Sequence, residues 1–311
     1  MMVPAVLLLL GVLTALLAPR LLGRADWTER EPVVALWVWQ CAVAAVLLCF
    51  ALSMVLSASA AWLVVRGRVF GSAPHAVVDA YTQGAGSPVA AGTALLLAMG
   101  GLWTGAKLAA EVLRTRSRRR RERAELHQRA PLLPGEDPGA ERLVVLEGPR
   151  PDAWWLPGPA AQLVVTTAAL SRLKGRQLDA VLAHEQGHAV ARHDWLLHCA
   201  EALAGGFPQV PVFAAFRAEM HRLVELAADD AASKRYGRLT IALALIELNE
   251  HTGVFGPCPS THAHVPQRVR RLLTAKPRLT PLRRLRLTAA AALVPAVPLL
   301  VAFAPGLTAL S

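Results

Sequence analysis

The hydrophobic positions gather in four long uncharged stretches, which polar and Arg-rich segments separate. The stretches cover residues 3–18, 33–65, 88–106 and 287–311. The apolar core of a bilayer takes about 20 residues of helix, so we expect four transmembrane helices. Their predicted positions are about 3–22, 33–60, 88–110 and 287–307. A cleaved signal peptide is the alternative for the first stretch, but residues 1–10 hold none of the basic residues that such a peptide needs.

The pattern changes between the third and fourth stretches. Residues 113–141 are a basic juxtamembrane segment followed by a Pro- and Gly-rich linker. Short apolar runs bounded by Pro or Gly then predict strands, at residues 143–146, 154–156 and 162–167. From Ala168 the apolar spacing becomes helical. We therefore predict a mainly α, polytopic membrane protein in which residues 1–112 hold three spans, residues 142–275 form an inserted α+β domain, and residues 276–311 hold a basic flank and the last span.

Composition and charge assign an orientation to these spans. The 311 residues are 54% hydrophobic and only 18% charged, which argues against an ordinary soluble enzyme, yet the net charge is +11. The flanks on one side of the predicted membrane hold 15 Lys and Arg, and those on the other side hold two, Arg66 and Arg68. Basic flanks stay in the cytoplasm, so we expect both termini outside the cell membrane and the inserted domain inside.

The Arg run at residues 114–123 has two interpretations. It could bind nucleic acid, but no aromatic residue interrupts it and no DNA-binding motif follows it. Attraction to anionic lipid at the inner face of the membrane explains the run more simply. We therefore expect membrane lipid, and no direct nucleic acid, as its partner.

The candidate chemistry lies in a predicted helix at about residues 175–192. It contains His184, Glu185 and His188 in the order His-Glu-Gln-Gly-His. Residues four apart lie on one face of a helix, so both imidazoles can bind one cation while Glu185 reaches a water on that cation. The same pentapeptide can arise by chance. Its position in an amphipathic helix after a short sheet favours a hydrolytic zinc site.

A catalytic zinc ion needs a third protein ligand. Glu225 and Asp229 share a face of the next predicted helix, at about residues 212–235, and His221 is a rival ligand one turn earlier. A solvated acidic face is the alternative for this pair, but Leu and Ala residues flank both carboxylates. A carboxylate in such surroundings is costly unless it is paired or on a metal. We therefore favour Glu225 as the ligand and Asp229 as the group that orients a ligand histidine.

These elements together resemble the membrane-embedded gluzincin metallopeptidases. The resemblance rests on LDAVLAHEQGHAVARHDW, ELAADDAA and THAHVPQRVRRLL, within about residues 142–274. Two branches of this family are similar to the chain. One is the antirepressor type of the BlaR/MecR sensor-transducers, and the other is the heat-shock and prenyl-endopeptidase type. Three spans before the domain and one after it resemble the first branch more, because the second usually has a hydrophobic hairpin after the HExxH helix.

The resemblance implies roles for individual residues. His184, His188 and Glu225 would bind one zinc ion per chain, Glu185 would be the general base, and Asp229 would support the site from behind. His262 and Arg268 match the downstream element, and His262 is a candidate for stabilising the oxyanion. Arg192, His193 and Asp194 are expected to cap or brace the helix rather than bind metal.

The expected function is a zinc-dependent endopeptidase at the cytoplasmic membrane face. Its substrate would be a protein or peptide, either a BlaI-like transcriptional repressor in a signalling pathway or membrane proteins in quality control. A non-catalytic receptor or scaffold that retains the zincin fold is the competing class. Beta-lactam sensing is not expected, because the outer segment at about residues 66–87 is too short for a sensor domain.

Overall fold

The computed structural model describes residues 2–66, 88–129, 142–149, 151–156, 162–249, 265–274 and 277–310. The N-terminal part consists of α1 (Met2–Leu22), α2 (Trp27–Arg30), α3 (Pro32–Arg66) and α5 (Pro88–Arg129). A small sheet follows, with β1 (Arg142–Leu146), β2 (Ala153–Leu156) and β3 (Gln162–Thr166). The remaining helices are α6 (Thr167–Arg172), α7 (Arg176–Val190), α8 (His193–Gly206), α9 (Pro211–Tyr236), α10 (Arg238–Asn249), α11 (Val265–Thr274), α12 (Pro281–Leu293) and α13 (Ala296–Leu310). The expected small sheet followed by helices is confirmed.

Two helices near the N-terminus are long and apolar enough to cross a membrane. They are α1 and the Pro32–Ser57 part of α3. The predicted fourth span is a bent pair, α12 and α13, with an angle of 43° between them, and counting that pair as one span gives up to three in the described part of the chain. The bend falls at Val294 and Pro295, where the proline lacks the N–H that a continuous helix would use.

The predicted third span, at about residues 88–110, coincides with the first half of α5 and is not among the spans found in the described residues. The helix also continues well past the predicted span, to Arg129. The basic run is therefore part of one long helix rather than a separate segment. The predicted linker at residues 131–141 lies outside the described residues.

The three strands form one sheet in the order β1-β3-β2. β1 and β3 are parallel, with Val144 opposite Val164, and β2 is antiparallel to β3, with Trp155 opposite Leu163. β3 lies between the other two strands and both of its edges are paired, so an extended substrate cannot add to it. Among the described strands, β2 has an unpaired edge, and it lies against α7.

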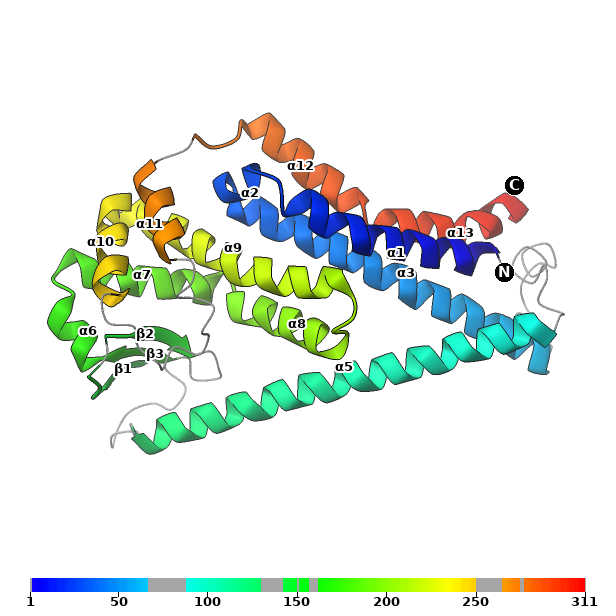
Figure 1. Ribbon diagram of the computed structural model, residues 1–311, viewed down its shortest axis with the longest axis horizontal. Helices are drawn as coiled ribbons and strands as arrows, with labels where there is room; N and C mark the ends of the chain where they lie inside the picture. Colours follow the sequence, from blue (N-terminus) through cyan, green and yellow to red (C-terminus); the bar gives the residue numbers. More distant parts are fainter. Residues whose placement is uncertain are drawn as a thin grey trace.

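The largest apolar core joins the predicted membrane helices to the inserted domain. Trp39 and Val46 of α3 pack with Phe216, Met220 and Leu223 of α9 in one buried cluster, to which Leu196 and Leu203 of α8 also belong. Figure 1 shows α8 and the first half of α9 side by side between α3 and α5. Helix α8 and the first half of α9 therefore form an apolar helical hairpin directly after α7.

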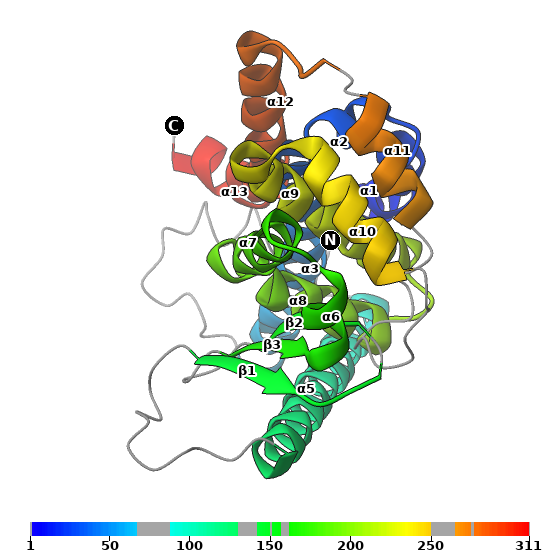
Figure 2. The ribbon, with the colours of Figure 1, turned by 90° about the vertical axis from the view of Figure 1, so that its left-hand side faces the viewer.

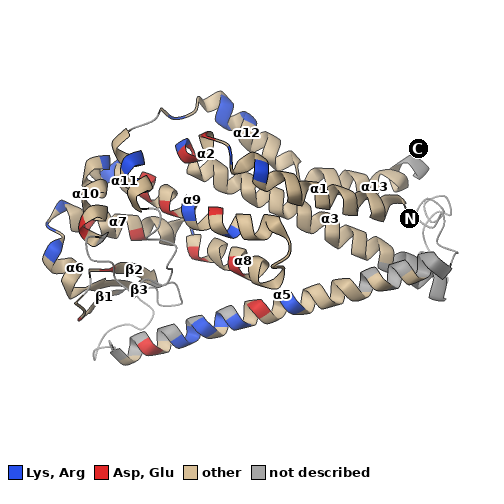
Figure 3. Ribbon diagram, in the orientation of Figure 1, with Lys and Arg blue, Asp and Glu red and all other residues tan. Residues whose placement is uncertain are grey.

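The described Lys and Arg residues are unevenly distributed between the two ends of the molecule. The N-terminal end of α1 and the C-terminal end of α13 lie at one end, while the sheet, α7, α10 and α11 lie at the other (Figure 1). Figure 3 shows the described Lys and Arg residues concentrated toward the end with the sheet, along α5, α11 and α12. The view onto that end in Figure 2 shows α7 between the sheet and α9.

Candidate metal centre

The centre forms where α7 crosses α9. Gly187 of α7 faces this crossing, and a Cβ added there would lie 3.5 Å from Ala228 Cα and 3.5 Å from Ala231 Cβ of α9. Small residues on both helices therefore allow a close approach. As a result, the 184–188 face of α7 is turned toward the stretch of α9 that begins at Glu225.

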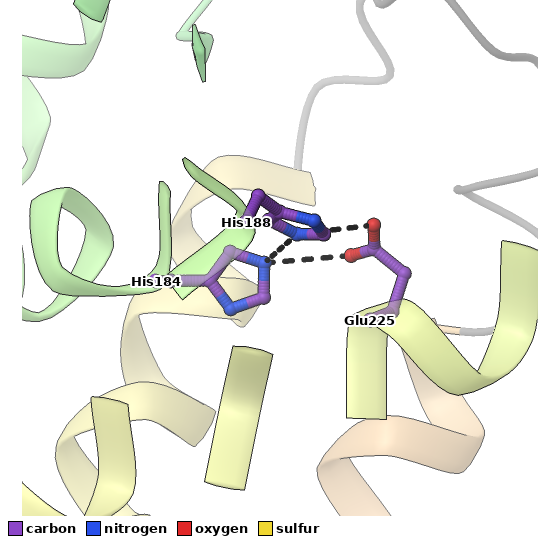
Figure 4. Close-up of side chains that lie close together, drawn as sticks. All are labelled: His184, His188 and Glu225. Atoms are coloured by element: carbon purple, nitrogen blue, oxygen red, sulfur yellow. Dashed lines mark hydrogen bonds and ion pairs between the residues drawn. The ribbon is translucent and has the colours of Figure 1, made fainter. Parts of the chain in front are cut away.

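His184, His188 and Glu225 converge at this crossing (Figure 4). The Nε2 atoms of the two histidines are 3.1 Å apart, and each lies 3.5 Å from one oxygen of Glu225. Two donors about 2.05 Å from one tetrahedral zinc ion would be separated by about 3.3 Å, so these spacings fit a single zinc ion. Two imidazoles and a carboxylate are also a donor set that zinc accepts.

Asp229 and Arg268 contact the triad on the side away from its three candidate donor atoms. Asp229 is fully buried, and its Oδ1 lies 3.0 Å from His184 Nδ1, the nitrogen that faces away from the other donors. Arg268 of α11 donates from Nε and Nη2 to the two oxygens of Asp229, at 2.8 and 2.7 Å. Its Nη1 lies 2.7 Å from Oε2 of Glu225. One buried arginine therefore positions both a candidate ligand and the carboxylate that orients another.

Burial and these contacts separate the protonation states of the site. Burial lowers the pKa of His188 to about 3. Burial alone would also lower the pKa of His184, but the carboxylates of Asp229 and Glu225 outweigh it and raise this pKa to about 10. Burial opposes ionisation of Glu225 and Asp229, yet Arg268 holds both pKa values down, with that of Asp229 at about 2. Without a metal, the site therefore holds a proton on His184 and negative charge on both carboxylates.

Glu185 faces the sheet rather than α9. The backbone N–H of Trp155 in β2 donates to Glu185 Oε2 at 3.0 Å. Burial raises the pKa of the Glu185 carboxyl to about 7, where a carboxylate can both take up and release a proton near neutral pH. The edge strand and the candidate base are thus directly connected.

The family model described as peptidase family M48 matches residues 116–276, just over half of the chain. The chain belongs to peptidase family M48. No curated protein and no solved structure matches it. The M48 match makes the chain a metallopeptidase, and the matched residues include the whole His184, His188 and Glu225 cluster.

Some of the residues predicted for this M48 site lie at the triad, and others lie elsewhere. Glu225 lies with the two histidines, whereas the rival ligand His221 lies outside the triad, with its Nε2 2.9 Å from Glu201 Oε1 of α8. The Oδ1 atom of Asp229 lies 3.0 Å from Nδ1 of His184. Arg268 contacts two of the site's carboxylates, and His262 lies outside the described residues.

Sequence reasoning missed His193 as a neighbour of the triad. It is the first residue of α8, it is only 4% exposed, and its Nδ1 lies 3.1 Å from Nδ1 of His188. Its spacing of five residues from His188 is not a helical spacing, so periodicity placed it elsewhere. The turn that brings it back depends on Arg192, whose φ is 51°. A histidine directly after the motif helix was the available signal.

Proposed function

We propose that this protein is an integral-membrane zinc endopeptidase that cleaves peptide bonds at the cytoplasmic face of the membrane. The observation that carries the proposal is the meeting of His184, His188 and Glu225 with spacings that fit one zinc ion, beside a partly buried Glu185. Membership of family M48 supports hydrolysis of peptide bonds by such a site.

The roles of the residues follow from their positions. Zinc on His184, His188 and Glu225 would supply the positive charge that activates water and polarises the scissile carbonyl. Glu185 takes a proton from the attacking water and passes it to the leaving amine. The Trp155 N–H holds this carboxylate by one oxygen, and Arg268 neutralises the charge of Glu225 and Asp229.

The free edge of β2 is the proposed place for the substrate backbone. Alternate residues of a strand direct their N–H groups to opposite edges, so the N–H of Ala153 shares the edge from which Trp155 contacts Glu185. A peptide that adds to this edge as an extended strand passes the base directly.

The activity is tested by Glu185→Gln in the full chain, purified in detergent. The amide cannot accept the proton, so cleavage is expected to fall by about 10²- to 10⁴-fold while zinc stays bound at one ion per chain. Glu201→Gln is the matched control, because Glu201 contacts His221 and Arg217 and lies outside the triad. Unchanged proteolysis by Glu185→Gln would refute the assignment, and the absence of zinc from the parent protein would favour a non-catalytic receptor or scaffold.

Two substrate classes are consistent with this chemistry. Regulatory cleavage of a BlaI-like repressor was proposed from the arrangement of predicted spans. The heat-shock and prenyl-endopeptidase branch usually has a hydrophobic hairpin after the HExxH helix, and in this chain α8 and the start of α9 form an apolar hairpin at that place. This observation favours membrane-protein quality control as the second candidate function.

Substrate trapping with Glu185→Gln in native membranes separates the two classes. A single soluble repressor in the trap, together with a change in a small set of transcripts, supports regulatory cleavage. A range of membrane proteins in the trap supports quality control. Beta-lactam addition is expected to change neither result.

A further inference from the structure

The two ring nitrogens of His188 have different neighbours, and these neighbours decide which nitrogen carries the proton. Its Nε2 faces His184 Nε2 and Glu225, so Nε2 is the nitrogen that would bind a metal. A neutral imidazole that binds through Nε2 carries its proton on Nδ1. The His188 side chain is only 16% exposed. Its N–H therefore needs an acceptor, which for metal-binding histidines is usually a carboxylate, a backbone carbonyl or water.

The group found at that position is His193. The two Nδ1 atoms are 3.1 Å apart, and the rings meet edge to face with their centroids 4.9 Å apart and an interplanar angle of 80°. Because only one proton can lie between two ring nitrogens, one of them must be the donor and the other the acceptor. If His188 binds metal through Nε2, then His188 is the donor and His193 accepts with the lone pair of its own Nδ1.

The backbone before His193 indicates that this placement is specified. Arg192 adopts φ 51° and ψ 40°, and it is the only non-glycine residue with positive φ in the described part of the chain. An L-residue disfavours this conformation, and such outliers persist where the surrounding structure requires them. The turn ends α7 at Val190 and begins α8 at His193, which returns His193 to the side of His188.

We propose that His193 is a positioning residue that accepts the Nδ1 proton of His188 and so holds His188 in the tautomer that binds zinc. The two candidate histidine ligands then have different partners, the carboxylate of Asp229 for His184 and a neutral imidazole for His188. This inference rests on the proposed zinc site and adds a residue that touches neither zinc nor substrate.

Two substitutions at one position test the role of the acceptor. In His193→Asn, the side-chain oxygen stands where Nδ1 stood, so an acceptor remains. In His193→Leu, the volume remains but no acceptor does. We expect the zinc dissociation constant, measured by chelator competition on the full chain in detergent, to rise about 10- to 100-fold in His193→Leu and to stay within about threefold of the parent in His193→Asn.

Cobalt provides a readout that does not depend on activity. The visible absorption of Co²⁺ in the site is expected to change in His193→Leu and to be preserved in His193→Asn. Equal zinc binding by the parent and His193→Leu overturns the proposal, and so does an equal loss in both variants, which would indicate a packing role. If His193→Leu does not fold, His193→Gln is used instead, since its side-chain amide extends beyond the Nδ1 position and is expected to weaken zinc binding as well. Failure of the parent to bind zinc would refute the proposed function itself.

Discussion

His184 has acidic partners on both of its ring nitrogens. Nδ1 faces Asp229 at 3.0 Å and Nε2 faces Glu225 at 3.5 Å, which explains why the pKa of this imidazole is raised to about 10 despite its burial. His188 lies one turn away with its pKa lowered to about 3 by burial. Neighbouring histidines on one helix therefore enter metal binding in opposite protonation states.

This difference predicts proton release on zinc binding. At pH 8, His184 carries a proton that must leave Nε2, His188 is neutral, and Glu185, with a pKa of about 7, is mostly ionised. Titration calorimetry in two buffers of different ionisation enthalpy should show about one proton released per zinc ion. Zinc binding without proton release at pH 8 would contradict the protonation of His184.

The same pKa has a consequence for the metal-free protein. The pKa of His184 is about 10 in the folded protein and 6.5 for an ordinary histidine. Protonated His184 therefore stabilises the folded state fully below pH 6.5, and this stabilisation is lost as the pH rises toward 10. Metal-free and zinc-bound protein should therefore diverge in thermal stability as the pH rises over this range.

Gly187 offers a second prediction at the scale of one residue. A Cβ at this position would make ordinary contacts of 3.5–3.6 Å with Ala228 and Ala231, so alanine fits without displacing α9. Alanine also favours a helix over glycine by about 1 kcal/mol. We expect Gly187→Ala to stabilise the metal-free protein by up to about 1 kcal/mol in thermal unfolding. Gly187→Val, which adds atoms beyond Cβ at the same crossing, is the contrast and should destabilise it.

Helix α11 connects three parts of the chain at the scale of elements. Arg268 reaches the triad, Arg271 reaches Asp230 of α9 and the carbonyl of Glu29, and Gln267 donates to the Glu29 side chain at 2.7 Å. Glu29 belongs to α2, in the turn between α1 and α3. The position of α11 beside the metal centre is thus set partly by the turn between the two N-terminal helices.

Asp230 is the carboxylate on which this connection depends. It is buried, and its oxygens lie 2.9 Å from Arg271 Nη1 and 3.3 Å from Arg278 Nη2. Asp230→Ala leaves the buried Arg271 without its carboxylate, so we expect a loss of about 3 kcal/mol in urea unfolding. Glu201→Ala, which removes a more exposed carboxylate, should cost less than about 1 kcal/mol. Equal effects of the two substitutions would contradict the importance of Asp230.

The arrangement of the whole molecule agrees with the proposed orientation in the membrane. The ends of α1 and α13 lie together, away from the sheet, and the described basic residues concentrate toward the metal centre (Figure 3). Basic flanks stay on the cytoplasmic side of a membrane, so the proposed orientation would place the end toward which α5 and its Arg run extend in the cytoplasm.

Topology reporters test this orientation directly. A reporter that is active only outside the cytoplasm should be active when it is fused after Ser311. A cysteine at Arg116, in a variant whose native cysteines are replaced, should react with a membrane-impermeant thiol reagent only after the cells are permeabilised. Labelling of the cysteine at position 116 in intact cells would contradict the proposed topology.

Local patterns in the sequence predicted the elements and the candidate donor set. Apolar length predicted α1 and the apolar part of α3, and short runs bounded by Pro and Gly predicted the three strands. The i, i+4 rule placed His184 with His188, and the cost of an unpaired carboxylate among apolar residues favoured Glu225. Each of these inferences depends on residues within one element, where helical or strand periodicity is sufficient.

Only the tertiary structure decided which elements meet. Strand order made β2 the free edge beside Glu185, the crossing at Gly187 brought α9 to the histidines, and a left-handed turn at Arg192 returned His193 to His188. Pro295 lies at the bend in the last predicted span, and an apolar hairpin of α8 and α9 joins the candidate membrane helices to the domain. Packing between segments far apart in the chain sets these relations, and periodicity within a segment carries no information about its partner.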